Sequence, residues 1–545
     1  MKPSPVHALS RRDFFASTAC ALAGTTLAAL GVAGERAAAA PDDRSVGTTA
    51  AKKIFYGLTD TLDEFRKLAE ICVQYNGTHI FVSDLAKARW WLDKFPDDPY
   101  PNWGMLSSSL LKTLPPAPIK PYVPQDWVEK NLTLLAQRSE ILKDYGLKAA
   151  FSCCEPGWLP NEVFAEHPTW RGPRYEKPRR AKNAYYSPCM DNAEILSLYE
   201  DTIKALCEIV PVEYFTFLTN DSGAGICWSH GLYPGINGNT ACKHIAFGQR
   251  VSKFLTTLQD AANEVTSNVQ IELAGSIPDH EIEQVIPYLK PGQSVNGMSN
   301  TREPLTYTVG YVASFYSCGL YPAYNIPQPI NYIEDYARAC AAPDKNMIVC
   351  LESLKEPFFE RLYAKCEHTD PKPKTLKNCE RSLYDFCCDE VGSQYADLLY
   401  ETYNHIMTAK NGVMPVASGG PLFLLGPVNQ RWLTRPFVAE PLKLKPEERD
   451  YYRKYLFQAM SEEVAEDMMD LQGLRLVGGH SAAYIVSNIL SDGIVELEKA
   501  VEKVNKIVEA MSGDQEEEYK VFGMRLRALI CIYKNARNTI QFQDL

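Results

Sequence analysis

The sequence predicts an α/β protein, a (β/α)8 TIM barrel with long loops, followed by a C-terminal helical domain. Between residues 51 and 440, short runs of apolar and β-favouring residues alternate with helical segments about eight times, which is typical of such a barrel. Beyond residue 441 only helical patterns remain. A doubly wound open sheet is the main alternative, but no G-x-G-x-x-G turn follows the first strand.

Each expected strand is a short apolar or alternating run that ends at polar or small residues. The first is followed by Thr61, a suitable N-cap, and by an apolar helical stripe from Phe65 to Val73. The stretch 307–329 is aromatic and irregular and is assigned to neither state. The expected strands are residues 54–58, 78–82, 147–152, 214–219, 269–274, 294–298, 347–351 and 412–416.

The C-terminal domain, residues 441–545, is predicted to contain three helices, over residues 446–470, 480–511 and 514–540. The middle one carries apolar residues at helical spacing, with Glu and Lys between them. Such a stripe packs either on the barrel or on another subunit, so a homo-oligomer formed through these helices stays open.

The first forty residues are predicted to be an export signal. Residues 10–15, Ser-Arg-Arg-Asp-Phe-Phe, resemble a twin-arginine motif, and an apolar run over 21–33 and the small residues 38–40 follow. We expect cleavage near Ala40, a linker over 41–50, and a periplasmic or secreted protein. The apolar run is too short for a transmembrane helix and no later run reaches that length, so no integral membrane segment is expected.

Composition favours a carbohydrate over a polyanion as the partner. The formal net charge of −11 disfavours nucleic acid and anionic membranes. The chain has 30 Tyr and 8 Trp, whose flat rings stack on sugar faces, although they also fill protein cores.

The cysteines and histidines do not predict a metal or cofactor. None of the 16 Cys forms a Cys-x-x-Cys pair or lies at zinc-finger spacing with His, and several sit in apolar runs as small core residues. The His residues are scattered and are interpreted as structural. We therefore predict neither a metal site nor a cofactor.

Polar residues follow most of the expected strands. In a barrel these strand ends surround one mouth, whatever their separation in sequence. Aromatic residues of the long loops, Trp158, Trp228 and Tyr233 among them, would be within reach of a sugar bound there. The predicted mouth residues are Asp60, Asp84, Glu155, Asn220, Asp221, Asn300, Arg302, Glu303 and Glu352.

Carboxylates around an aromatic opening are what cleavage of a glycosidic bond requires. One carboxylic acid gives a proton to the leaving oxygen, and a second, ionised carboxylate attacks the anomeric carbon or activates water. Asp221, which follows a buried strand and precedes a Gly-rich turn, is our candidate acid, and Glu352 is its partner. Structural roles stay open: a turn cap for Asp221, and a salt bridge to Arg302 or Lys355 for Glu352.

The other carboxylates of the mouth also have two interpretations. Glu155 could contact substrate or accept hydrogen bonds from loop amides. Asp84 and Asp60 could contact sugar or order their loops.

Asn220-Asp221 closing the fourth expected strand and Glu352 closing the seventh resemble the acid/base and nucleophile positions of the retaining barrel glycosidases. That clan has Asn-Glu on strand four, whereas this chain has Asp221, one methylene shorter. Hexosaminidase barrels, including O-GlcNAcase-like ones, are also similar: they place two acidic residues at the fourth strand, and some carry a helical domain after the barrel. Here the first residue of that pair is Asn220. The resemblance, which covers roughly the barrel, implies a carbohydrate substrate.

The sequence therefore predicts an exported glycoside hydrolase acting on an oligo- or polysaccharide. A sugar lyase or isomerase with a divalent metal on the same barrel is one alternative. A non-catalytic carbohydrate-binding protein is the other.

The export signal can be tested directly. Arg11→Lys together with Arg12→Lys should leave an uncleaved precursor in the cytoplasm, because the twin-arginine pathway reads the guanidinium pair. Fractionation and N-terminal sequencing would measure this, with the unaltered chain expected to begin near Pro41. Normal export of the double variant would instead indicate the general secretory route.

Overall fold

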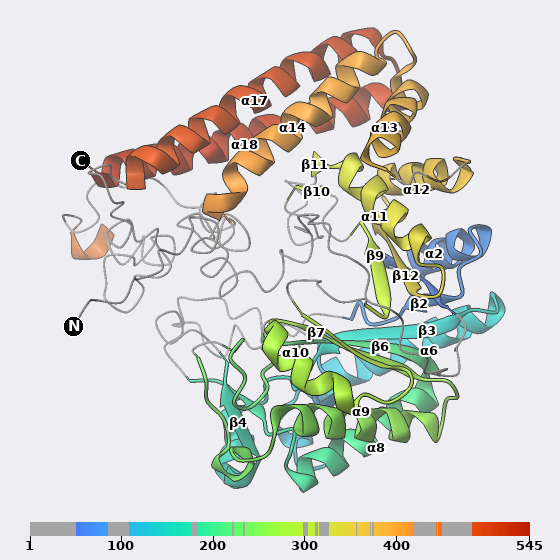
Figure 1. The fold of residues 1–545 in the computed structure, drawn as a ribbon, viewed down its shortest axis with the longest axis vertical. Helices are drawn as coiled ribbons and strands as arrows, with labels where there is room; N and C mark the ends of the chain where they lie inside the picture. Colours follow the sequence, from blue (N-terminus) through green and yellow to red (C-terminus); the bar gives the residue numbers. More distant parts are fainter. Residues whose placement is uncertain are drawn as a thin grey trace, which may run out of the picture. The chain divides into compact units, whose positions relative to one another are not determined.

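The computed structural model describes residues 51–85, 108–175, 184–220, 223–232, 235–297, 304–310, 314–315, 326–355, 357–370, 372, 375–417, 443, 445–448 and 482–544. The chain divides into two compact units, one within residues 28–396 and the other within residues 397–545. We describe each unit by itself (Figure 1). The predicted signal and linker, residues 1–50, lie outside the described residues.

Eight parallel strands form the main sheet of the first unit. In chain order they are β1 (Lys53–Leu58), β2 (His79–Phe81), β3 (Lys148–Cys154), β6 (Val212–Thr219), β7 (Gln270–Gly275), β8 (Gln293–Asn296), β9 (Thr306–Val309) and β12 (Asn346–Ser353). Two small antiparallel pairs are β4 (Arg171–Arg174) with β5 (Tyr186–Pro188), and β10 (Ser314–Phe315) with β11 (Ile326–Pro327).

The order of strands in this sheet is that of a barrel. It runs β8-β7-β6-β3-β2-β1-β12-β9, so neighbours in the chain pair with one another and the eighth strand pairs with the first, while β8 and β9 are the two edges of the sheet. A doubly wound sheet would reverse its order near the middle. The predicted fold class is confirmed: an α/β fold with eight parallel strands curled into a half-barrel, with helices at the C-terminal end.

Side chains that reach across the sheet reveal its curl. The hydroxyls of Tyr214 on β6 and Thr306 on β9 lie 3.0 Å apart, although four strands lie between β6 and β9 in the sheet. The Nδ2 of Asn346 on β12 donates to Gln270 Oε1 on β7 at 2.8 Å. Apolar side chains fill the enclosed space beside these bonds: Ile54, Phe81, Ala150, Tyr214, Ile348 and Cys350.

Helices cover the outer face of the strands and connect them. Helices α8 and α9 lie side by side, and Tyr199 of α8 meets Phe254 of α9 edge to face (Figure 1). The helices of this unit are α2 (Leu62–Gln74), α5 (Leu110–Thr113), α6 (Gln125–Asp144), α7 (Asn161–Glu166), α8 (Ala193–Ile209), α9 (Phe247–Asn263), α10 (Asp279–Val285), α11 (Pro329–Ala341), α12 (Phe358–His368) and α13 (Leu376–Val391), with the short 3-10 turns η1 (Lys120–Tyr122), η2 (Pro168–Trp170), η3 (Thr240–Cys242) and η4 (Ile286–Tyr288).

Two strand assignments made from the sequence were wrong. Residues 412–416 belong to helix α14 (Ala396–Ala417), in which Tyr403, Ile406, Ala409 and Val413 are buried at helical spacing. The seventh strand is β9, whose four residues begin at Thr306 and run three residues into the stretch 307–329 that was assigned to neither state. The strand that ends near Glu352 is consequently the eighth, so the fourth-and-seventh placement of the retaining clan is not matched.

The described part of the C-terminal unit is helical. Helix α14 is joined there by α17 (Ala482–Ala510) and α18 (Asp514–Asp544), which match two of the three predicted helices. Leu490, Ile494 and Leu497 are buried along α17. Gly493 permits a close approach, since a Cβ there would lie 3.1 Å from the Tyr533 ring. None of the helices in the described part of the chain is long and apolar enough to cross a membrane.

The interior of the half-barrel contains one buried carboxyl that the sequence analysis did not single out. Glu272 on β7 accepts a hydrogen bond from the Ser294 hydroxyl on β8 at 3.0 Å. It also interacts with Thr306 on β9. Burial raises the pKa of Glu272 to about 7, while the two hydroxyls act in the opposite direction. The folded protein therefore holds a proton here that the unfolded chain has lost above about pH 4.5.

This carboxyl should make stability depend on pH. Because the folded pKa lies above the unfolded one, the free energy of unfolding should fall as pH rises from about 4.5 to about 7, by ~3 kcal/mol, and then level off. Glu272→Gln keeps the volume and removes the titration, so its unfolding free energy should lack this decline. Denaturant unfolding at several pH values would measure the difference, with Glu129→Gln on the exposed side of α6 as the control. Parallel curves for both variants would contradict the assignment.

Candidate active site

Asn220 directly follows β6, the fourth strand, at the carboxyl edge of the sheet. Its backbone is left-handed, with φ of 55°, a conformation that asparagine tolerates better than most residues. The buried side chain uses both ends of its amide: Nδ2 donates to Ser229 Oγ (2.8 Å) and to the Ser276 carbonyl (3.1 Å), and Oδ1 accepts from the Ile226 amide (3.0 Å). Asn220 thus fixes the loop after β6 against the end of β7.

A hydrogen-bonded chain continues from Asn220 to helix α10. The Ser229 hydroxyl donates to Glu281 Oε2 at 2.6 Å, and the His230 amide donates to Glu281 Oε1 at 2.7 Å. The Nδ1 of His230 also lies 3.0 Å from Glu281 Oε1. Glu281 is almost fully buried, whereas the imidazole of His230 is exposed. The chain therefore leads from the strand end to an imidazole at the surface.

His230, His280 and Glu281 together could hold a cation. Their ligand atoms lie within 4.8 Å of one another, and the two rings meet edge to face with centroids 4.9 Å apart. Imidazole and carboxylate are ligands that divalent transition metals accept. This group was not predicted, because Glu281 follows His230 by 51 residues and no carboxylate lies at metal-site spacing from the histidine in the sequence.

Glu352 lies at the carboxyl end of β12, the eighth strand. The pairing of β12 with β1 shifts register between Cys350 and Ser353, and Glu352 lies within this irregularity. It is 8 % exposed, and its backbone is left-handed with φ of 56°. A glutamate gains nothing from that conformation, which costs about 1 kcal/mol or more. Strain of this kind concentrates at functional sites.

Asp84 and Asp60 lie at the ends of β2 and β1. Asp84 Oδ2 accepts from the Thr59 amide at 3.2 Å, and Arg138 of α6 donates to the Asp84 carbonyl at 2.8 Å. Asp60 forms an exposed ion pair with Lys355 at 2.5 Å. Both residues thus order their loops in this structure, and contact with a sugar stays a prediction.

Glu155, at the end of β3, is fully buried and accepts hydrogen bonds from loop amides, as one of its two interpretations expected. The amides of Leu110 (2.5 Å) and Gly157 (2.8 Å) and the Tyr199 hydroxyl (2.5 Å) donate to its two oxygens. Burial raises the pKa of Glu155, against the effect of these donors and of buried Lys112. The carboxylate orders the loop in this structure, and a role in substrate binding is not tested.

The aromatic candidates differ in accessibility. Trp158 is 1 % exposed and packs edge to face on Tyr185, with the Lys112 ammonium 5.5 Å from its ring centre. Trp228 is partly buried, donates from Nε1 to the Asn239 carbonyl at 2.8 Å, and has Lys243 over its ring. Trp158 is therefore part of a core, and Trp228 keeps an accessible part. Five predicted residues lie outside the described part of the chain: Asp221, Tyr233, Asn300, Arg302 and Glu303.

No family model and no curated protein matches the chain. Among solved structures, it is similar to a GH138 enzyme targeting pectin rhamnogalacturonan II, at 10 % identity and a TM-score of 0.43, covering 91 % of this chain and 59 % of that one. It is also similar to an O-GlcNAc hydrolase mutant of Thermobaculum terrenum (11 %, TM-score 0.35, 91 % and 96 %). A third is the GH36 α-galactosidase of Geobacillus stearothermophilus (11 %, TM-score 0.30, 62 % and 38 %).

All three are glycoside hydrolases, and the chain resembles them in structure at low identity. It spans little more than half of the first protein's length. Such low identities and TM-scores do not carry an activity over to this chain.

The role of Asn220 can be tested by comparing two left-handed asparagines. Asn220→Gly relieves the strain of the left-handed backbone, but it removes the side chain that hydrogen-bonds Ile226, Ser229 and Ser276. The substitution should therefore lower the free energy of unfolding by ~2 kcal/mol. Asn268, also left-handed with φ of 61° but exposed, is the matched control, and Asn268→Gly should change stability by only a few tenths of a kcal/mol. Thermal or denaturant unfolding measures both. Equal, small effects would show that the Asn220 side chain does not hold the loop.

Proposed function

We propose that the protein is a glycoside hydrolase acting on an oligo- or polysaccharide, with its active site at the carboxyl edge of the half-barrel. The observation that carries this proposal is Glu352: a carboxylate 8 % exposed, at the carboxyl end of the eighth strand, held in a left-handed backbone. Catalytic residues of parallel barrels occupy this edge.

The proposed partner of Glu352 is Asp221, the residue after Asn220. In a ring of eight strands the fourth and the eighth stand on opposite sides, so groups that follow β6 and end β12 would flank a sugar between them. This arrangement replaces the fourth-and-seventh pair expected from the sequence. Such an arrangement would supply the two carboxylates on opposite sides of the bond that glycoside hydrolysis needs.

We assign Asp221 as the acid that protonates the leaving oxygen and Glu352 as the base that activates a water. Aspartate is one methylene shorter than glutamate, which favours a wide gap with room for that water, about 6.5–9.5 Å between carboxyl groups. Inversion at the anomeric carbon would follow. The exposed His230 and the accessible part of Trp228 belong to the loop that follows β6, and we propose them as sugar contacts.

A metal-dependent sugar lyase or isomerase is the second candidate, favoured by the group His230, His280 and Glu281. In either case the predicted signal would place the activity in the periplasm or outside the cell.

The proposal predicts separate effects on activity and folding. Glu352→Gln and Asp221→Asn should each lower turnover of responsive aryl glycosides by ~10²–10⁴-fold while melting within a few degrees of the unaltered chain. Glu352→Gly should also be inactive, although it relieves the left-handed strain. A fluorogenic glycoside panel and product analysis by NMR would measure rate and stereochemistry, with Glu129→Gln as the control. Full activity of Glu352→Gln would refute the assignment.

Two further outcomes separate the alternatives. Activity lost on chelation and in His230→Ala, but kept in Glu352→Gln, would favour the metal-dependent enzyme. Oligosaccharide binding by calorimetry without turnover of any substrate would favour a non-catalytic binding protein.

A further inference from the structure

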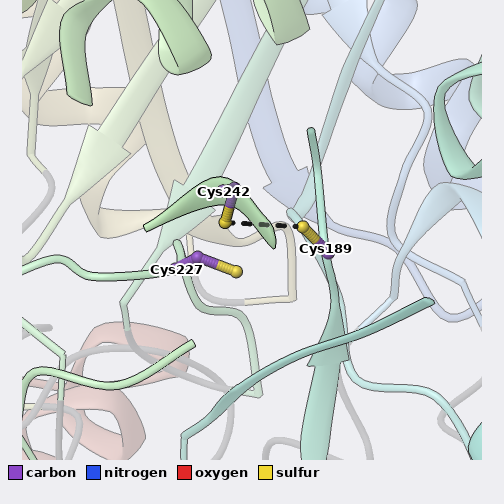
Figure 2. Close-up of side chains that lie close together, drawn as sticks. All are labelled: Cys189, Cys227 and Cys242. Atoms are coloured by element: carbon purple, nitrogen blue, oxygen red, sulfur yellow. Dashed lines mark hydrogen bonds between the residues drawn. The ribbon is translucent and has the colours of Figure 1, made fainter. Parts of the chain in front are cut away.

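Three cysteines from separate segments converge beside the loop that follows β6 (Figure 2). Cys189 comes directly after β5, Cys227 lies seven residues beyond Asn220, and Cys242 ends the turn η3. All three are 1–2 % exposed. Their sulfur atoms lie within 4.8 Å of one another.

The spacing of the sulfurs is not that of a disulfide. Cys189 Sγ and Cys242 Sγ are 3.8 Å apart, whereas a disulfide bond measures about 2.05 Å. Nor does the cluster resemble an ordinary apolar core. Among the described residues its buried members are the three cysteines, with the partly buried Trp228 packed against them.

The spacing does suit thiolates around one metal ion. Zinc binds sulfur at about 2.3 Å in a tetrahedron, which places two ligand sulfurs about 3.8 Å apart. The Cys189–Cys242 distance has this value already. A metal at the centre would need little rearrangement of the backbone.

The backbone around the cluster is built for close approach. Gly238 lies against Cys227, and a Cβ at Gly238 would be only 2.6 Å from the Cys227 Cβ. The Cys227 carbonyl accepts from Nη1 of buried Arg250 at 2.8 Å, and the Cys189 amide donates to the Trp170 carbonyl at 2.7 Å. Three elements therefore fix the positions of the thiols: the β4–β5 pair, the loop after β6, and helix α9.

The surroundings also suit negative charge. Arg250 is 2 % exposed and donates to the Cys227 carbonyl, so a buried guanidinium lies beside the cluster. Three thiolates on Zn²⁺ carry a net charge of −1, which the guanidinium can balance.

We propose that Cys189, Cys227 and Cys242 form a zinc site that clamps the loop after β6 to the β4–β5 pair. Within the described ranges no fourth Cys, His, Asp or Glu joins the group, so the fourth position is for water or another donor. The soft sulfur set selects zinc over magnesium or calcium. The inference of a zinc site does not rest on the proposed glycosidase activity.

Metal analysis of the full chain, purified under reducing conditions without chelator, tests this site. We expect about one zinc per chain. Cys189→Ser, Cys227→Ser and Cys242→Ser should each weaken zinc binding at least ~10-fold. Cys207→Ser is the matched control, since Cys207 of α8 is equally buried but outside the cluster, and it should keep its zinc.

Cobalt substitution of the unaltered chain tests the site without relying on variants that could fail to fold. The unaltered chain, stripped by chelator and titrated with Co²⁺, should show a thiolate-to-cobalt charge-transfer band of an intensity that fits three thiolates. Zinc should abolish the band. Absence of the band in a folded, reduced chain would overturn the proposal.

Two other results would also overturn it. One is a Cys189–Cys242 disulfide found by peptide mapping of the chain isolated without reductant. The other is zinc retained in all three serine variants and lost in His230→Ala, which would assign the metal to His230, His280 and Glu281 instead.

Discussion

Tyr214 and Thr306 belong to strands that lie five positions apart in the order of the sheet, yet their hydroxyls are 3.0 Å apart. This contact exists only because the sheet curls on itself. In a flat sheet the ends of β6 and β12, four strand spacings apart, would be separated by about 19 Å. Curling brings them to face each other across an interior. A site that uses both strand ends therefore depends on this curvature.

The curvature of the sheet costs stability, because it buries polar side chains in the interior. Closing the strands around polar side chains leaves Glu272 buried among Ser294, Thr306 and Tyr214, and burial raises the pKas of both Glu272 and Tyr214. The groups are tolerated because they bond one another across the strands. At the carboxyl edge the left-handed backbones of Asn220 and Glu352 add strain. The fold thus holds polar and strained residues at positions where a simple core would be more stable.

Sequence patterns predicted the parts of this fold that are local. The residues of strands such as Tyr214–Thr219 were sufficient to predict those strands. The small residues that follow Asn220 were sufficient to predict the turn. β9 was missed because four residues carry too little periodicity, and residues 412–416 were mistaken for a strand because a helix end can imitate one. The error moved Glu352 from the seventh strand to the eighth.

The candidate site was predictable only where it depends on strand ends. Asn220, Asp84 and Glu352 could be chosen because each ends a recognisable strand. Glu281, Glu272 and the three cysteines could not, because their partners lie 15 to 53 residues away with no fixed spacing, and only the folded chain brings them together.

The loop after β6 is held at separate points by different chemistry. Asn220 binds its start through the Ile226 amide, Glu281 binds Ser229 and His230, and Cys227 meets the thiols of Cys189 and Cys242. A substrate-binding loop gains precision from such fixed points, because less freedom is lost when a ligand binds. If the chain is exported through the twin-arginine route, it folds in the reducing cytoplasm, where three neighbouring thiols meet zinc before any oxidant. The predicted signal and the proposed zinc site then meet one requirement: the loop after β6 must fold and bind zinc before the protein leaves the cytoplasm.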